Sequence, residues 1–452
     1  MTRLFGTDGV RRLANRTVTA GLALQLAEAG ARVLAGPAPE GRERPFAVVG
    51  RDTRVSGEML AAAVAAGVSA AGVDVLLVDE LPTPGVAHAV KQTGASFGVV
   101  LSASHNPMPD NGIKFFAAGG RKLDDELEDR IQALMGQEWD RPTGAAIGRI
   151  TRFPSAVDEY TEALVTEVER HRDDSPLAGL TVVVDCAHGA ASVVGPAALR
   201  QAGAQVIVTA ADPNGYNIND GVGSTHIENL VDEVKAHNAD LGVAFDGDAD
   251  RCLAVDSLGR PINGDQIMGI LALGLKERGL LAQDTLVVTT MSNLGLHLAM
   301  EKAGIRTVQT GVGDRYVLEE MLRGGYNLGG EQSGHVLMLD HGTTGDGVQT
   351  ALHLMARMAQ TKRTLADLAA EIPQLPQVLI NVSGVDKTQV AHPVVAAEVA
   401  RVEAELAGGG RVLLRASGTE SLIRVMVEAG TEESARSHAE SLAAVVSAEL
   451  AL

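Results

Sequence analysis

The sequence predicts an α/β protein: three similar βα domains with mixed sheets, followed by a smaller C-terminal α+β domain. Two observations predict this class. Short apolar runs alternate with helical segments in three successive sets between residues 46 and 370, and such alternation indicates sheets covered by helices. Each set contains one apolar run that ends in a polar loop, at residues 102–107, 246–251 and 327–335.

Composition narrows the class of protein. The chain has 452 residues, of which 45% are hydrophobic and 21% charged, as expected of a multidomain globular enzyme. Its net charge of −19 argues against nucleic acid or an anionic membrane as the main partner. Cys186 and Cys252 both lie in apolar strand-like runs, so we expect reduced, buried thiols. With no signal-peptide core and no long apolar run, a cytoplasmic protein is expected.

The first set of elements begins with a helix capped by Thr19. We expect strands at 46–49, 73–78 and 97–101, and helices at 56–71, 85–92 and 124–135. Asn111-Gly112 is a hairpin-turn signal, which predicts that the chain turns there and brings Lys114 back toward the preceding polar loop. Residues 137–155, with Pro142, Pro154 and two glycines, are expected to form the first linker.

The later sets follow the same logic. For the second we expect strands at 181–185, 205–209 and 241–245, and helices at 191–202 and 228–237. For the third we expect strands at 285–290 and 306–309, and helices at 264–278, 294–303, 315–323, 345–360 and 364–370. For the fourth we expect strands at 378–382, 412–414 and 423–427, and helices at 394–406 and 432–449. The predicted domains are 1–153, 154–256, 257–371 and 372–452.

The first polar loop contains Ser104-His105-Asn106-Pro107 after a buried apolar run. In open α/β sheets, ligands bind outside the carboxyl ends of the strands. A hydroxyl beside an imidazole at such an end can act as a nucleophile or carry a phosphoryl group. Taken alone, this loop fits better with a capping serine in an ordinary turn. The other loops favour the chemical interpretation.

The second polar loop carries three alternating carboxylates, Asp246, Asp248 and Asp250, followed by Arg251. Three carboxylates that face one point suit a hard cation such as Mg²⁺. An EF-hand is excluded because Arg251 occupies its glycine position and a strand precedes the loop. An aspartyl-phosphate phosphatase site and a solvated acidic turn are the alternatives. Because like charges repel, removing one by Asp248→Asn is expected to raise stability in metal-free buffer.

Other loops offer groups for a phosphorylated sugar. Arg11 ends a glycine-bracketed loop, and guanidinium groups pair with phosphate in a fork geometry. The third polar loop offers side chains suited to sugar hydroxyls. Its candidate residues are Glu331, Ser333 and His335. The fourth domain presents a compact phosphate cradle. Its candidate residues are Arg415, Ser417, Gly418, Thr419 and Arg424. Each of these motifs alone also fits an ordinary turn. Together with the serine and aspartate loops they indicate phosphoryl transfer to or from a sugar phosphate.

With these motifs the chain resembles members of the α-D-phosphohexomutase superfamily, and within it the bacterial phosphoglucosamine mutase family. The resemblance runs from end to end. It is carried by residues 5–11, 50–54, 102–107, 246–251, 330–335 and 415–420. Two positions depart from the usual pattern: Arg12 stands where the family usually has glycine, and Ser421 where it usually has proline. Both flank motifs, so they affect the expected local backbone and not the chemistry.

The resemblance implies four domains around a central cleft, a phosphorylated Ser104, and one Mg²⁺ held by Asp246, Asp248, Asp250 and the phosphoserine. It implies transfer of the phosphoryl group from Ser104 to O1 of glucosamine 6-phosphate, with glucosamine 1,6-bisphosphate as intermediate and activator. The 6-phosphate would then return to Ser104 and leave glucosamine 1-phosphate, a precursor of UDP-N-acetylglucosamine. Lys114, Arg11 and Arg251 would supply positive charge. His105 and Arg11 are both candidates for the general base.

Substrate choice is the least determined feature. Glu331 is the only acid in the third polar loop, and a preference for an amino sugar needs an acceptor at C2. Gln332 is characteristic of the glucosamine type. The alternatives are a phosphoglucomutase or phosphomannomutase on the same scaffold, or a catalytically silent sugar-phosphate binding protein. The oligomeric state stays open between monomer and homodimer.

Overall fold

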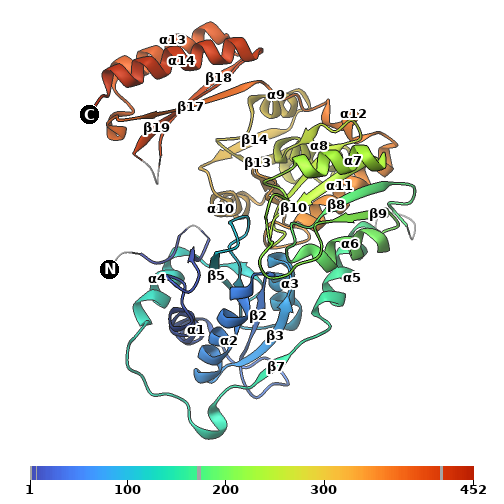
Figure 1. The fold of residues 1–452 in the computed structure, drawn as a ribbon, viewed down its shortest axis with the longest axis vertical. Coiled ribbons are helices and arrows are strands. Elements are labelled where there is room, and N and C mark those ends of the chain that lie inside the picture. Colours follow the sequence, from blue (N-terminus) through green and yellow to red (C-terminus); the bar gives the residue numbers. More distant parts are fainter. Residues whose placement is uncertain (1–2, 7, 170–174, 418–420) are drawn as a thin grey trace. The chain divides into compact units, whose positions relative to one another are not determined.

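The structure is a computed structural model that describes residues 3–6, 8–169, 175–417 and 421–452. The chain divides into two compact units. The first consists of Met1–Met291 and Gly304–Glu371, and the second of Ser292–Ala303 and Ile372–Leu452. Three of the four sheets in the described residues belong to the first unit and the fourth to the second (Figure 1).

The first sheet has seven strands, in the order β1-β5-β4-β2-β3-β7, with β6 paired to β5. These strands are β1 (Val10–Leu13), β2 (Phe46–Arg51), β3 (Asp74–Glu80), β4 (Phe97–Leu101), β5 (Asp110–Ala117), β6 (Arg121–Lys122) and β7 (Ile150–Arg152). Strands β4, β2, β3 and β7 run parallel, and β5 is antiparallel to its neighbours β4 and β1. Because β5 returns directly beside β4, the intervening loop of residues 102–109 is held at the carboxyl end of β4.

Helices cover both faces of this sheet. They are α1 (Ala20–Leu34), α2 (Val55–Ala70), α3 (Thr83–Thr93) and α4 (Asp125–Leu134). Apolar side chains of α1 and α2, such as Leu26 and Leu60, join one core cluster with strand residues of β2 and β4. On the other face α3 packs so closely that a Cβ at Gly98 would lie 2.5 Å from Val90 Cγ2. Glycine at this strand position therefore allows the close approach of α3.

The second and third sheets repeat this design. The second has the order β12-β11-β10-β8-β9 and the third the order β14-β13-β15-β16. Their strands are β8 (Thr181–Asp185), β9 (Gln205–Thr209), β10 (Leu241–Phe245), β11 (Cys252–Asp256), β12 (Pro261–Ile262), β13 (Thr285–Thr289), β14 (Arg306–Thr310), β15 (Leu328–Gly330) and β16 (Val336–Met338). Their helices are α5 (Ala156–Glu169), α6 (Ala191–Gln201), α7 (Glu228–His237), α8 (Gly264–Glu277), α10 (Asp314–Gly324), α11 (Gly347–Thr361) and α12 (Leu365–Ala369).

The three sheets share one feature that positions the polar loops. In each, a strand with a parallel neighbour leads through a polar loop into an antiparallel partner: β4 into β5, β10 into β11, and β15 into β16. Parallel pairing continues on the other side of the first strand in every case. The serine loop, the aspartate loop and the loop containing Glu331 thus occupy equivalent places in three related sheets, as the alternation in the sequence predicts.

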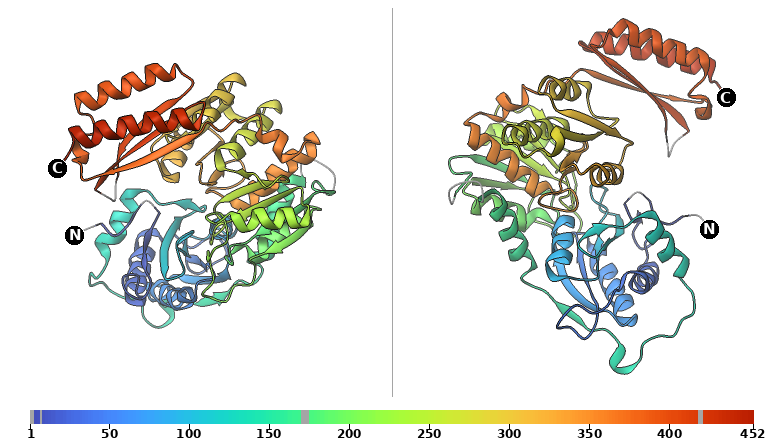
Figure 2. Two further views of the ribbon diagram at one scale, coloured as in Figure 1. Left: turned by 45° about the horizontal axis from the view of Figure 1, so that its top comes forward. Right: turned by 180° about the vertical axis from the view of Figure 1, so that it is seen from behind.

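The second unit is an α+β layer of different design. Its sheet is antiparallel throughout, in the order β17-β19-β18, with β17 (Gln377–Ser383), β18 (Arg411–Ala416) and β19 (Leu422–Glu428). Helices α13 (Pro393–Leu406) and α14 (Glu432–Glu449) lie side by side over one face of this sheet (Figure 2). Helix α9 (Leu294–Lys302) is part of this unit, and its Leu294 amide donates to buried Glu428 at 2.9 Å.

Two local predictions differ from the structure, and one helix was missed. Asn111-Gly112 lies inside β5 and makes no turn; the chain reverses in the preceding loop, and a Cβ at Gly112 would lie 2.4 Å from the Ser102 carbonyl oxygen. The predicted linker at 137–155 contains the 3-10 helix η1 (Gly144–Ala146) and strand β7, which extends the first sheet. Helix α5 was not predicted at all. Two further short 3-10 helices occur, η2 (Ala282–Asp284) and η3 (Lys387–Gln389).

Candidate active site

The serine loop holds Ser104 in an unusual backbone conformation. Its φ of 51° lies in the left-handed region, which a serine seldom adopts. The side chain is 2% exposed, and its hydroxyl donates to Asp246 Oδ2 at 2.5 Å. The Ser104 hydroxyl also lies 3.1 Å from Nδ1 of His105. A strained residue at a site with these neighbours is a candidate for chemistry, because strain persists only where the surroundings impose it.

Arg54 holds the backbone of this loop in place, a role that was not predicted from the sequence. Its guanidinium is fully buried and donates to the carbonyl oxygens of four loop residues. These acceptors are Ser104, Asn106, Pro107 and Asp110, at 2.6 to 3.1 Å. Asp52 balances the charge, with its Oδ2 2.8 Å from Arg54 Nε. One arginine thus satisfies carbonyl groups that β pairing leaves open.

The aspartate loop brings its three carboxylates together, as the alternation of Asp246, Asp248 and Asp250 predicts. One oxygen from each lies within 4.8 Å of the others, and all three side chains are buried. Asp246 Oδ2 accepts the Ser104 hydroxyl, so the serine and aspartate loops meet. Gly247 makes this approach possible, because a Cβ there would lie 2.7 Å from the Ser104 carbonyl oxygen. Asp248 also accepts the Thr83 hydroxyl at 2.6 Å.

Lys114 supplies a cation beside the carboxylates. Its Nζ lies 2.7 Å from Asp8, 3.0 Å from Asp248 and 3.7 Å from Asp250. Although burial opposes the charged form, these three carboxylates raise the pKa of Lys114. Lys114 was predicted to return to the serine by a turn at Asn111-Gly112. It reaches the site instead because β5 runs antiparallel beside β4.

A second layer of charges surrounds this centre, and none of its members was predicted. Lys122 contacts both Asp8 and Asp314. Burial would raise the pKa of Asp8, but Lys114, Lys122 and Arg11 hold it well below its usual range. Asp8, Lys122 and Asp314 lie more than a hundred residues apart in the sequence. Only the fold brings them together, so no sequence motif signals them.

His335 lies between two carboxylates and is 2% exposed. Its Nδ1 is 3.5 Å from Asp250 Oδ1 and its Nε2 is 3.4 Å from Asp314 Oδ2. Burial would lower its pKa, yet Asp250 and Asp314 raise it above the ordinary value. His335 thus links the aspartate loop to Asp314, and because it also lines the cavity described below, its contact with a sugar stays a prediction.

Electrostatics distinguish the carboxylates from one another. Burial raises the pKa of Asp246 well above its usual range, and the nearby charges of Asp250 and Asp248 raise it further. Burial alone would also raise the pKa of Asp250, but His335 and Lys114 lower it well below the usual range. Burial, together with Arg251 and Arg11, lowers the pKa of His105 to about 4, so its ring is neutral at pH 7.

A cavity of about 480 Å³ opens in front of this centre. Besides Ser104, it is lined by the candidate residues Arg11, His105, Arg251, Glu331 and His335. Arg11 contacts Asp8 at 2.9 Å. Arg251 donates its backbone N–H to Asp246 Oδ1 at 3.2 Å, and its Nε lies 3.9 Å from Asp250. Arg11, Arg12 and Arg251 line this cavity beside the Ser104 hydroxyl and can pair with a small anionic ligand, although four carboxylates line it as well.

The third polar loop contributes Glu331 to this cavity, whereas Ser333 is not among its lining residues. Glu331 lines it and accepts the Gly313 amide at 3.1 Å. The Ser333 hydroxyl is buried without a hydrogen-bond partner among the described residues. Gln332 points elsewhere: its Nε2 donates to Asp265 at 2.9 Å. Gln332 is therefore not among the residues that line the cavity.

The predicted phosphate cradle lies in the second unit. Arg415 of β18 pairs directly with Arg424 of β19 in the antiparallel register. Ser417 is buried, and Lys387 donates to its carbonyl oxygen at 2.8 Å. Gly418 and Thr419 lie outside the described residues. Directly opposed like charges destabilise a strand pair, so an anion bound between these arginines would be stabilising.

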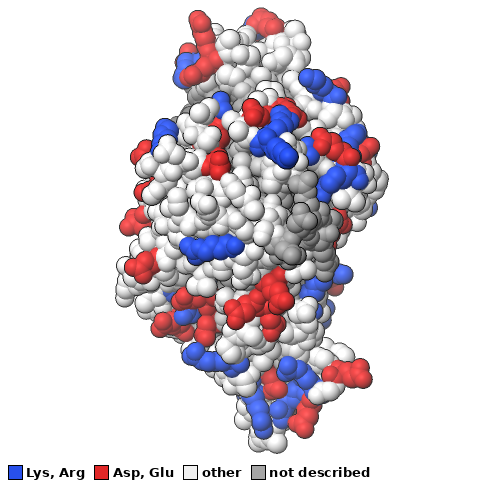
Figure 3. Space-filling view, turned by 90° about the vertical axis from the view of Figure 1, so that its right-hand side faces the viewer, with Lys and Arg blue, Asp and Glu red and all other residues white. Residues whose placement is uncertain are grey.

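Surface charge is mixed on the face shown in Figure 3, where Lys and Arg side chains lie among Asp and Glu side chains. Among residues whose positions are described, no helix has the length and apolar character needed to cross a membrane.

Comparisons with known proteins identify the family. Models of all four domains of the phosphoglucomutase/phosphomannomutase family match. Domain I matches residues 2–141, domain II 158–259, domain III 263–375 and the C-terminal domain 379–445. The phosphoglucosamine mutase of Acidothermus cellulolyticus is 59% identical over 98% of this chain and 95% of its own length. That of Streptomyces avermitilis is 58% identical over the full length of both chains.

Solved structures agree on the fold. A phosphoglucomutase/phosphomannomutase family protein from Burkholderia thailandensis superimposes with a TM-score of 0.79 at 22% identity, covering 99% of this chain and 98% of its own. Aspergillus fumigatus N-acetylphosphoglucosamine mutase, solved with GlcNAc-6P and magnesium, gives 0.67 at 18% identity, covering 98% and 96%.

The chain belongs to the phosphoglucomutase/phosphomannomutase family of the α-D-phosphohexomutase superfamily. It is therefore an intramolecular phosphotransferase of the isomerase class.

Proposed function

We propose that this enzyme interconverts glucosamine 6-phosphate and glucosamine 1-phosphate through phosphorylated Ser104 and a bound glucosamine 1,6-bisphosphate. The observation that carries the proposal is the Ser104 hydroxyl, which lies 2.5 Å from Asp246 in a cavity that Arg11 and Arg251 also line. Full-length relatives at 57–59% identity bear the name phosphoglucosamine mutase, which supports the amino sugar as substrate. The product would feed synthesis of UDP-N-acetylglucosamine.

The aspartate loop fits a Mg²⁺ ion. Asp248 Oδ1 and Asp250 Oδ1 are buried without a hydrogen-bond partner among the described residues, so both keep lone pairs for a ligand. Three carboxylates form an all-oxygen, anionic donor set of the kind that hard cations prefer. We propose that Asp246, Asp248, Asp250 and phosphorylated Ser104 hold Mg²⁺. When bound, Mg²⁺ neutralises and polarises the phosphoryl group that is transferred.

The chain's own residues supply the rest of the chemistry. In the first transfer the Ser104 Oγ–P bond breaks and an O1–P bond forms, while O1 loses its proton and Oγ gains one. In the second transfer the O6–P bond breaks and the Oγ–P bond forms again, while Oγ loses its proton and O6 gains one. Lys114, Arg11 and Arg251 offset the negative charge of the transferring group, with Arg11 and Arg251 lining the cavity. When Ser104 is rephosphorylated its hydroxyl must lose a proton. His105 is proposed as the base because its Nδ1 lies 3.1 Å from this hydroxyl, whereas the nearer acceptor, Asp246 Oδ2 at 2.5 Å, is proposed as a metal ligand.

The direct test of substrate class is ³¹P spectroscopy. The purified enzyme is incubated with Mg²⁺, a trace of sugar bisphosphate, and glucosamine, glucose or mannose 6-phosphate in separate samples. We expect kcat/KM for glucosamine 6-phosphate to exceed that for glucose 6-phosphate by more than about tenfold, with weak glucose turnover remaining. Equal or faster turnover of glucose or mannose 6-phosphate would favour a phosphoglucomutase or phosphomannomutase, and no turnover of any sugar would favour a silent binding protein.

Glu331→Gln tests the proposed reader of the amino group. Removing the charge should lower kcat/KM for both sugars, and that for glucosamine 6-phosphate more, by about 10–100-fold, because a hydrogen bond to a charged group is lost. Ser333 offers its buried hydroxyl to the sugar beside it. Glu301→Gln, an exposed change on α9, is the matched control. An equal loss on both sugars would exclude Glu331 as the source of the preference.

Arg415→Ala tests the phosphate clamp. We propose that Arg415, Ser417, Gly418, Thr419 and Arg424 hold the phosphate that is not reacting. The variant should raise KM for glucosamine 6-phosphate by about 10–100-fold, because a charge-assisted contact is removed, and should leave phosphorylation of Ser104 by sugar bisphosphate much less affected. Arg436→Ala, an exposed arginine of the same unit, is the control. An unchanged KM would contradict the clamp.

We propose a cytoplasmic location and a small-molecule sugar phosphate as the partner, in preference to nucleic acid or a membrane. The mixed surface charge on the face in Figure 3 and the net charge of −19 support this choice. Assembly as a homodimer stays a prediction, which sedimentation of the purified protein would test.

A further inference from the structure

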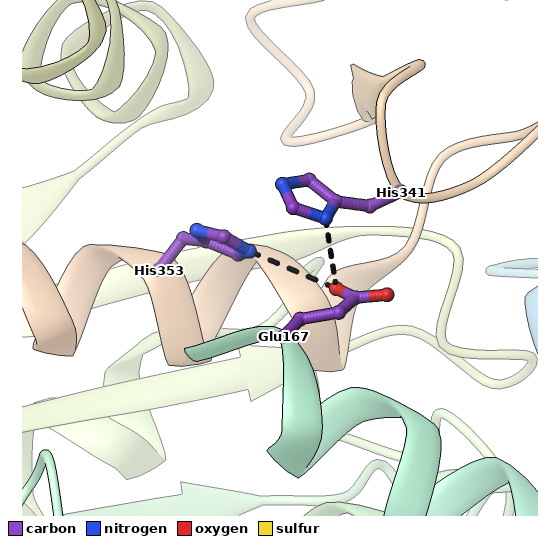
Figure 4. Close-up of side chains that lie close together, drawn as sticks. All are labelled: Glu167, His341 and His353. Atoms are coloured by element: carbon purple, nitrogen blue, oxygen red, sulfur yellow. Dashed lines mark ion pairs between the residues drawn. The ribbon is translucent and has the colours of Figure 1, made fainter. Parts of the chain in front are cut away.

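A second cluster of metal-ligating side chains lies apart from the aspartate loop and shares no residue with it. It consists of Glu167, His341 and His353, each supplying one ligand atom, and these atoms all lie within 4.8 Å of one another. Glu167 comes from α5, His341 from the turn after β16, and His353 from α11 (Figure 4). We propose that this cluster binds one Zn²⁺ ion.

The spacing of the three side chains suits a metal better than a hydrogen-bonded network. His341 Nδ1 and His353 Nε2 both point at the same carboxylate oxygen, Glu167 Oε2 (Figure 4). They lie 3.6 Å and 3.7 Å from it, beyond hydrogen-bond distance. Two ligands about 2.0–2.2 Å from a tetrahedral zinc ion are about 3.4 Å apart. The three atoms therefore already lie close to the corners of a zinc site.

A second, independent observation at His353 also points to a bound metal ion. Its Nε2 is a buried atom without a hydrogen-bond partner among the described residues. The side chain itself is 12% exposed and is fixed in the middle of α11. Leaving a buried imidazole nitrogen unpaired costs free energy. A metal bound to Nε2 would remove that cost.

The elements that carry the ligands hold them in place. The turn containing His341 is closed by two backbone hydrogen bonds, from the His341 and Gly342 amides to the Met338 carbonyl oxygen. Gln349, one turn before His353 on α11, donates to Glu167 Oε2 at 2.8 Å. Such an outer hydrogen bond orients a carboxylate ligand toward its metal.

The donor set distinguishes this cluster from the aspartate loop. Two imidazoles and one carboxylate favour zinc and similar transition metals, whereas three carboxylates favour Mg²⁺. Beside the two histidines lies a cavity of about 40 Å³, which has room for a water molecule as a fourth ligand. Bound zinc would join α5 to α11, two helices that pack against each other but lie far apart in the sequence, and so stabilise the folded chain.

The test measures zinc binding directly, in the Asp248→Asn background so that the aspartate loop contributes less. Chelator-stripped protein is titrated with Zn²⁺ against a chromophoric competitor, and thermal unfolding is followed with and without the metal. We expect one Zn²⁺ per chain with a dissociation constant of about 1 μM or lower, and a higher midpoint of thermal unfolding. His353→Gln and His341→Gln should each weaken zinc binding by more than about 100-fold, and Gln349→Ala by about 10–100-fold.

His237→Gln is the matched control, because His237 also lies beside a glutamate, Glu233 at 3.3 Å, but among the residues that the structure describes no third ligand accompanies that pair. Its zinc affinity should equal that of the parent. If a ligand variant fails to fold, the visible spectrum of Co²⁺ bound to the parent decides the question, since tetrahedral Co²⁺ absorbs strongly and octahedral Co²⁺ weakly. Zinc affinity unchanged by His353→Gln, or only a weak octahedral Co²⁺ spectrum, would overturn the proposal.

Discussion

Replacing Ser104 by alanine is expected to lower mutase activity by more than about a thousandfold. The hydroxyl is the only group of this side chain that can carry a phosphoryl group, and it lies 2.5 Å from Asp246. The fold should survive, because the loop is held through Ser104's carbonyl oxygen, which accepts from Arg54 and Asn219 at 2.9 Å and 2.8 Å. Alanine keeps that carbonyl.

Two measurements accompany this prediction. Intact-mass analysis should find a phosphate on part of the wild-type protein and none on Ser104→Ala. Ser437→Ala, which changes an exposed serine of α14, should behave like the wild type in both assays. Turnover by Ser104→Ala within tenfold of the wild type would exclude the proposed carrier.

Asp248→Asn should lower activity by more than about 100-fold, because one of three anionic ligands is lost from the proposed Mg²⁺ site. The structure changes the expected effect of Asp248→Asn on stability. If only the three carboxylates are considered, removing one charge relieves repulsion and should stabilise the protein. However, Lys114 lies 3.0 Å from Asp248 Oδ2, and removing one partner of a buried ion pair is costly. We now expect the free energy of unfolding in metal-free buffer to fall by about 1–3 kcal/mol.

Chemical denaturation in the presence of a chelator measures this change, and Asp232→Asn, an exposed aspartate of α7, is the control. A more stable Asp248→Asn protein would show that carboxylate repulsion outweighs the contact with Lys114. Wild-type activity that persists in excess chelator would remove the basis for Mg²⁺ altogether.

Positions that depend on local sequence could be predicted. Asp246 directly follows one buried strand and Ser104 is the third residue after another, so their place at a carboxyl strand end can be inferred from an apolar run and the polar loop after it. The three-fold repetition of that pattern also predicted the related sheets. Asn111-Gly112 misled because a turn signal was read without the strand pairing that overrides it.

Residues whose role depends on distant partners could not be predicted. Arg54 directly precedes α2. The residues next to it in the sequence give no sign that its guanidinium binds four carbonyl groups around residue 107. Asp8, Lys122 and Asp314 come from three separate segments and acquire their charge network only when the first and third sheets are formed. Glu167, His341 and His353 belong to the same category, since no spacing rule connects α5 with α11.

The most direct test of the account follows one phosphoryl group through a single turnover. Enzyme carrying a labelled phosphate on Ser104 is mixed with an equal amount of glucosamine 6-phosphate and Mg²⁺, and the reaction is stopped at short times. We predict that the label leaves the peptide containing Ser104 at least as fast as steady-state turnover and appears first in glucosamine 1,6-bisphosphate and then at C1 of glucosamine 1-phosphate. Label that stays on the protein while glucosamine 1-phosphate accumulates, or that resides on a residue other than Ser104, would contradict it.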